Sequence, residues 1–146
     1  MTEKGSYELL MCTIIHPSYV YSADFQSINC SKSRFLIATA SFDSKVRIHL
    51  ISLDPVKGTC IDNQELRVLD IRVQMEKIEP HSMLESIHPN ALVFNDEVLY
   101  VGDSRGTIHE WQVNLKSGLV NTQKVRTIKH SDLEGDAINY IAIEPE

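Results

Sequence analysis

Two stretches of the chain, FLIATASFDSKVRIHLI at residues 35–51 and EVLYVGDSRGTIHEWQV at residues 97–113, follow one pattern. They superimpose at an offset of 62 residues, which places Asp43 on Arg105 and His49 on Trp111. Each predicts a strand, a tight turn and a second strand, because apolar runs flank a short polar segment. A repeat at a fixed period indicates an architecture built from similar units.

Strand signals extend outward from both stretches. Val46, Ile48 and Leu50 alternate with polar residues, which predicts a strand with one buried face. The apolar runs at 35–40 and 98–101 are typical of strands covered on both faces. Each unit is completed by a strand before the repeat and a strand after it, predicted at 20–25 and 66–73 in the first unit and at 90–94 and 124–129 in the second.

The sequence therefore predicts an all-β chain with two complete four-stranded antiparallel units. An outer strand is also expected at residues 7–15, before the first unit, and an isolated inner strand at 139–143, after the second. Residues 74–88 are expected to hold one helical turn at most, because Pro80 and Pro89 restrict a helix there.

Composition excludes several classes of function. The chain has 146 residues, 42% of them apolar, which suits one globular domain or part of one. Its net charge is −6 and its 14 basic residues are scattered, which argues against nucleic acid or an anionic membrane as a direct partner. The apolar run near the N-terminus is broken by His16-Pro17, so neither a signal peptide nor membrane insertion is predicted.

Three cysteines, Cys12, Cys30 and Cys60, are odd in number and unpaired by spacing. This pattern favours reduced thiols and a cytoplasmic location. Neither Cys-x-x-Cys nor His-x-His clusters occur, so the sequence predicts no metal site and no cofactor.

The run VLYVGDSRGTIHEW resembles the second and third strands of a WD-repeat β-propeller blade. ATASFDSKVRIHLI is similar to the same element, with His49 in place of the family's tryptophan. The resemblance implies a partial propeller, whose missing blades come from a longer chain or from self-association. Its units are an outer strand at 7–15, a first blade at 16–73, a second blade at 74–129 and the start of a third at 130–146.

Blades of this family are commonly pinned by a hydrogen-bonded set of His, Ser or Thr, Asp and Trp. By resemblance, the first unit supplies His16, Ser41 and Asp43 as structural positions. The second unit supplies Trp111, but it has Asp103 at the Ser position and Arg105 at the Asp position, with His81 and His88 both candidates for the His. Neither set is complete, so the family's network is not expected to form.

The resemblance also implies a function: a non-catalytic scaffold for protein–protein interactions. Among WD-repeat proteins the order of motifs is most similar to scaffolds of the ciliary transition zone, which implies a place at the cilium base or basal body. The alternatives are a WD-repeat adaptor of trafficking, ubiquitin-ligase or chromatin complexes, and a small β enzyme or structural subunit of an enzyme complex. Candidate interaction residues are Tyr19, Phe42 and Arg105, since propellers bind partners through loops and exposed aromatic residues contribute strongly to interfaces.

Other suggestive residues have simpler interpretations. His16 and His88 each precede a proline and a strand, and are interpreted as turn residues, not as ligands or bases. The segment 103–106 is interpreted as a turn, because a phosphate loop needs more glycines and a following helix. Glu110 falls on the position of Ile48; partial exposure is expected, and pairing with Arg105 or Lys45 is the alternative.

Trp111, the only tryptophan, aligns with the blade tryptophan of the WD-repeat family, and this resemblance implies that it is largely buried between the two units. Replacing it with alanine should lower the free energy of unfolding by about 3 to 5 kcal/mol, because both the transfer energy and a cavity are lost. Chemical denaturation measures this loss. Tryptophan emission at the wavelength of the free amino acid in the folded protein would contradict the expectation.

Overall fold

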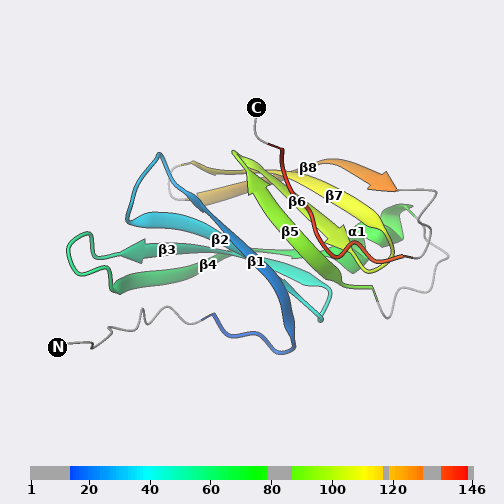
Figure 1. The fold of residues 1–146 in the computed structure, drawn as a ribbon, viewed down its shortest axis with the longest axis horizontal. Coiled ribbons are helices and arrows are strands. Elements are labelled where there is room, and N and C mark those ends of the chain that lie inside the picture. Colours follow the sequence, from blue (N-terminus) through cyan, green and yellow to red (C-terminus); the bar gives the residue numbers. More distant parts are fainter. Residues whose placement is uncertain (1–13, 79–86, 117–118, 130–135, 145–146) are drawn as a thin grey trace.

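The computed structural model describes residues 14–78, 87–116, 119–129 and 136–144. They form two four-stranded antiparallel sheets, each with its strands in chain order, and one short helix (Figure 1). The first sheet contains β1 (Val20–Ser27), β2 (Arg34–Ser41), β3 (Lys45–Leu53) and β4 (Cys60–Asp70). The second contains β5 (Pro89–Asn95), β6 (Val98–Asp103), β7 (Thr107–Lys116) and β8 (Leu119–Lys129). The prediction of an all-β fold with antiparallel four-stranded units is confirmed.

The two sheets share local irregularities as well as strand order. In the first sheet the ladder between β3 and β4 shifts register at Ile48/His49, and in the second the ladder between β7 and β8 shifts at Glu110/Trp111. These positions are equivalent at the sequence offset. Such irregularities bend a strand and change its local twist. Their repetition at equivalent positions indicates that the duplicated sequence folds in the same way twice.

The central turns also correspond. Ser44 and Gly106 occupy equivalent positions and both have positive φ, 73° and 86°. Glycine adopts this conformation without steric cost, whereas serine does not. Ser44 is buried, and its hydroxyl donates a hydrogen bond to the carbonyl of Ile87, which joins the turn of the first sheet to the entry of the second.

The sheets pack face to face around one apolar core. The core residues of the first sheet and the helix include Leu36, Ala38, Ala40, Val46, Ile48, Leu50, Ile71 and Met75, and those of the second include Leu92, Leu99, Val101, Trp111 and Val113. Trp111 is 2% exposed, so the expected burial of its side chain is confirmed. Close packing of this kind makes the free energy of unfolding sensitive to any truncation in the core.

The first strands of the two sheets lie side by side (Figure 1). Side chains of β1 receive hydrogen bonds from the backbone of β5. Ser22 Oγ accepts from Leu92 N at 3.3 Å, and Asp24 Oδ2 accepts from Phe94 N at 2.8 Å. These bonds satisfy donors on the edge of β5 that does not pair with β6, and they fix the position of one sheet relative to the other.

The outer strands are longer than the sequence pattern predicted. β4 begins at Cys60 and β8 at Leu119, whereas strands were expected only at 66–73 and 124–129. Both are edge strands, because only one side of each is hydrogen-bonded to a neighbouring strand. Their sequences mix polar and apolar residues. The apolar alternation that reveals a half-buried strand is weak in such a sequence.

A helix occupies residues 71–78, so residues 71–73 are not the end of a strand, as was expected, and the helical turn expected within 74–88 is part of a longer helix. Helix α1 (Ile71–Ile78) follows β4 directly and spans eight residues. Asp70 caps it, since its Oδ1 accepts hydrogen bonds from the backbone N–H groups of Arg72 and Val73. Ile71 and Met75, one turn apart, are buried in the core. The short apolar stripe and the cap outweigh the nearby proline, which lies after the helix.

β3 is buried on both faces, although the alternation predicted one. Arg47 and His49 are 8% and 7% exposed, against 0% for Val46 and Ile48. A charged side chain is buried at low cost only when it is paired. Arg47 has such a partner in Asp43, so a polar position becomes part of the interior.

The C-terminal segment 136–144 lies against the second sheet and has no assigned strand, although an inner strand was expected at 139–143. Its contact with the sheet is close, because Ile138 N donates to the carbonyl of Asp103 at 2.9 Å. A Cβ placed on Gly102 would lie 2.2 Å from Ile138 Cγ2. Most of the strand expected at 7–15 falls outside the described residues, and Ile14 and Ile15 are not part of a strand.

Replacing Gly102 with alanine should therefore destabilise the protein. The added methyl group overlaps the side chain of Ile138, and overpacking of this kind costs about 1 to 3 kcal/mol. Urea denaturation measures the loss. The double variant G102A/I138A should recover part of it, and a G102A protein as stable as wild type would contradict the close packing of this segment.

Candidate protein-interaction site

Four aromatic side chains gather where the two sheets meet, and we call Tyr19, Tyr21, Phe42 and His88 the aromatic rim. Tyr19 is 76% exposed, and Tyr21 and Phe42 are each 47% exposed. The Phe42 ring lies 6.4 Å from Tyr19, 6.3 Å from Tyr21 and 5.0 Å from His88, measured between centroids. Exposed aromatic residues that form one contiguous patch are typical of interaction surfaces.

Backbone hydrogen bonds hold the rim in place. Phe42 N donates to the carbonyl of Tyr19 at 2.8 Å, which joins the β2–β3 turn to the entry of β1. In the second sheet Ser104 N donates to the carbonyl of His88 at 2.9 Å, and His88 N donates to Ser104 Oγ at 3.1 Å. The Tyr21 ring stacks on His88 at 4.9 Å with an interplanar angle of 16°, so the rim bridges the two sheets.

The structure brings together two of the three predicted interaction residues directly. Tyr19 and Phe42 are neighbours in the aromatic rim, as their ring contact shows. Arg105 follows Ser104 in the β6–β7 turn, is half-buried, and donates its backbone N–H to Asp103 Oδ1 at 2.9 Å. Sequence reasoning missed Tyr21, and it interpreted His88 as a turn residue or a candidate blade histidine, not as part of a surface. Tyr21 lies two residues after Tyr19, where the β1 ladder shifts register between Val20 and Ser22.

The structural positions of the first unit form a different network from that of the family. Arg47 pairs with both carboxylate oxygens of Asp43, at 3.2 and 2.5 Å, and its NH1 lies 3.3 Å from His16 Nδ1. Burial alone raises the pKa of Asp43, but the hydrogen bonds and charge of Arg47 outweigh it and lower this pKa below the usual value.

Ser41 is fully buried in β2. His49, on the tryptophan position, hydrogen-bonds through Nδ1 to Asn63 Oδ1 at 2.9 Å.

The second unit has its own network, centred on Asp103. This residue is fully buried, and its Oδ1 accepts from Arg105 N and from Thr107 N at 2.9 and 3.0 Å. Its Oδ2 lies 2.8 Å from Nε2 of His109, which is also fully buried. His109 was not predicted, although its place two residues before Trp111 puts both on one face of β7.

Lys124 completes this network from the edge strand β8. Its Nζ lies 2.7 Å from His109 Nδ1 and 4.0 Å from the centroid of the Trp111 ring. Burial lowers the pKa of Lys124 to about 8, with a further lowering by Lys77 and an opposing effect of Asp103. A cation over the face of tryptophan is favourable by about 0.5 to 2 kcal/mol, which partly offsets the cost of burial.

Glu110 is buried, so the expected partial exposure is wrong. Its side chain pairs with Arg126 of β8, not with Arg105 or Lys45. Arg126 lies directly across the ladder from Glu110. A cross-strand ion pair lets a carboxylate occupy the position that an isoleucine holds in the first sheet.

The expectation of reduced thiols is correct for Cys30 and wrong for Cys60. Cys30 is free and exposed. Cys60, at the start of β4, is disulfide-bonded. Sequence spacing carries no information on which cysteines the fold brings within bonding distance. Cys12 lies outside the described residues.

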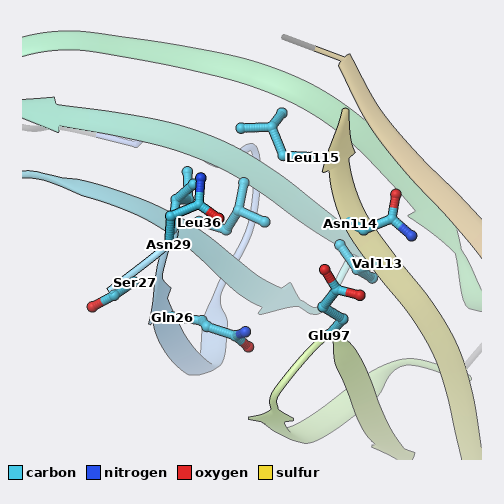
Figure 2. A pocket seen from close by; sticks show the side chains of 9 residues that line it. Gln26, Ser27, Asn29, Leu36, Glu97, Val113, Asn114 and Leu115 are labelled. Carbon is cyan, nitrogen blue, oxygen red and sulfur yellow. The ribbon is translucent and has the colours of Figure 1, made fainter. Parts of the chain in front are cut away.

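Two hollows lie at the opposite end of the strands from the aromatic rim. The smaller, of about 80 Å³, is lined by residues of both sheets, including Gln26, Glu97 and Asn114 (Figure 2). The larger, of about 430 Å³, is an open depression beside it. The first is well below the usual size of a ligand pocket, and no cluster of metal-binding side chains occurs in the described part of the chain.

A search against models of known protein families finds no match to this chain. A search among curated proteins likewise finds no significant relative. No helix within the described residues has the length and apolar character needed to cross a membrane. Among the described residues, the aromatic rim gathers partly exposed aromatic side chains of both sheets into one patch.

The buried position of Lys124 leads to a pH-dependent stability. Its pKa in the folded state is about 8, below the usual value of about 10.4, so the unfolded chain binds more protons between these values. The free energy of unfolding of wild type should thus rise relative to that of a Lys124→Met variant as pH increases from 8 to 10. Denaturant titrations at both pH values measure the difference. A constant difference would show that Lys124 is not desolvated.

Proposed function

We propose that this chain is a non-catalytic scaffold that binds partner proteins through the aromatic rim. The carrying observation is the contiguous patch of Tyr19, Tyr21, Phe42 and His88, which spans two sheets and is fixed by backbone hydrogen bonds. Rigid aromatic side chains bury a large area on binding at a low cost in conformational entropy.

We further propose that the two sheets are blades of a WD-repeat propeller. This is supported by their strand order, the turns with positive φ at equivalent positions and the repeated ladder irregularities. Propellers close with about 4 to 8 blades. In this proposal the remaining blades come from a longer polypeptide or from self-association.

Within that family the order of motifs resembles jouberin, a scaffold of the ciliary transition zone and basal body. The motifs are HPSYVYSADF, the repeat ending in DSKVRIHLI, YVGDSRGTIHEW and DAINYIAIEP. We therefore propose the cilium base as the specific location. The competing roles are a WD-repeat adaptor in trafficking, ubiquitin ligation or chromatin, and a structural subunit of an enzyme complex.

A localisation experiment tests this proposal. The chain fused to a fluorescent protein is expected to concentrate at the base of cilia in ciliated cells, and the double variant Y19A/F42A should lose this concentration. Both residues are exposed, so the free energy of unfolding should change little. Phe25→Ala is the matched control, because Phe25 is 63% exposed on β1 and contacts Phe35 instead of the rim.

Three outcomes distinguish the proposed ciliary role, another adaptor role and the absence of binding through the rim. Loss of localisation in Y19A/F42A but not in F25A supports binding through the rim. Concentration at another cellular structure, still dependent on the rim, favours a different adaptor role. Localisation that is unaffected by either variant would contradict the rim as the binding site.

A further inference from the structure

Asp103, His109 and Lys124 lie in a hydrogen-bonded series that scaffolding does not require. His109 Nε2 is 2.8 Å from Asp103 Oδ2, and Lys124 Nζ is 2.7 Å from His109 Nδ1. An amine is thus in contact with an imidazole that a carboxylate orients. This order of groups, a nucleophile, a base and an orienting acid, is the arrangement that activates nucleophiles in proteins.

The hydrogen bonds determine which nitrogen of His109 carries the proton. Asp103 already accepts two backbone N–H groups, and as a carboxylate it accepts a third bond from His109 Nε2–H. His109 Nδ1 then presents a lone pair to Lys124. Burial lowers the pKa of His109, which Asp103 partly opposes, so the imidazole is in the neutral form that can accept a proton.

We propose that Lys124 is an acylation site: its amine, with His109 as base and Asp103 as positioning residue, accepts an acyl group from a thioester. Lys124 is half-buried on β8, the edge strand of its sheet, and its ring and imidazole contacts hold Nζ in one place. Titratable groups around it come from three elements: Asp103 on β6, His109 on β7 and Lys77 on α1.

The reaction is balanced without an oxidant or a further reactant. The ammonium group of Lys124 first releases one proton to solvent. Nζ of the neutral amine then attacks the thioester carbonyl carbon as one N–H proton passes to His109 Nδ1. The tetrahedral intermediate expels the thiolate, which takes that proton and leaves as a thiol, while Lys124 keeps an amide.

Electrostatics favours this lysine over an ordinary one. Burial lowers the pKa of Lys124 to about 8, so roughly a quarter of the amine is neutral at pH 7.5, against about 0.1% for a lysine of usual basicity. Acylation removes the positive charge, and with it the cation–π contact to Trp111. The modification would therefore loosen the contact of β8 with the core.

The test incubates the full chain with acetyl-CoA at pH 7.5 and measures acetylation of each lysine over time by mass spectrometry. Lys57 is the internal reference, because it is exposed in the turn between β3 and β4. Lys124 should be acetylated at least about tenfold faster than Lys57, a conservative share of the difference in neutral amine. Equal or slower acetylation at Lys124 would overturn the proposal.

Variants separate the role of the base from simple exposure. His109→Gln should reduce the rate at Lys124 to that at Lys57, and Asp103→Asn should reduce it partly and shift its pH dependence. His16→Gln is the matched control, since His16 contacts Arg47 of the first sheet and should leave the rate unchanged. An unchanged rate in folded His109→Gln would overturn the proposal.

If the variants fail to fold, the pH dependence of the acetylation rate in the wild-type chain still tests the proposal. Acetylation at Lys124 should level off at a lower pH than acetylation at Lys57. Superimposable profiles would overturn the assignment. Because neither readout involves the aromatic rim, the proposed scaffold function and the acylation site stand or fall separately.

Discussion

The buried carboxylate of Asp103 is the group on which the second sheet depends. Its side chain fixes the β6–β7 turn through two backbone N–H groups and orients His109, while its carbonyl accepts Ile138 N of the C-terminal segment. A buried ion is stable only if such partners replace water. The turn, the interior of β7 and segment 136–144 are thus held by one residue.

In the first sheet, a different set of side chains pairs the buried polar groups. There the ion pair of Asp43 and Arg47 takes the central place, and His16 joins it. Backbone geometry is shared between the sheets because strand register and turn conformation are duplicated. Side-chain networks are not shared, because the residue types at equivalent positions differ: Asp43 corresponds to Arg105, and His49 to Trp111.

These networks leave the aromatic rim free to act as a surface. Backbone hydrogen bonds within each sheet hold the segments that carry its rings, and the Tyr21 ring stacks on His88 between the sheets, so the rim is held in place without being buried. Preorganised surfaces lose little entropy on binding. The Asp103 network extends from the β6–β7 turn through His109 to Lys124 on the edge strand β8. The chain therefore has two chemically separate features, the aromatic rim and this network.

The sequence by itself determined the all-β fold, the two antiparallel units and the burial of Trp111. The fold and the units follow from local apolar alternation, turn residues and the repeat, and the burial of Trp111 follows from its place in a motif that resembles a WD-repeat blade. It also indicated Tyr19 and Phe42 as exposed aromatic residues. The sequence did not reveal the full lengths of β4 and β8, because an edge strand with one solvated side has no strong apolar alternation.

Only the tertiary structure decided which polar groups meet. Arg126 faces Glu110 because of the register between β7 and β8, and Lys124 reaches His109 across the same ladder, shifted by one irregularity. Helix α1 likewise depends on Asp70 as its cap and on a core that Ile71 and Met75 can enter. Such pairings are set by strand register and by burial, which depend on residues distant in the chain and therefore leave no local signal in the sequence.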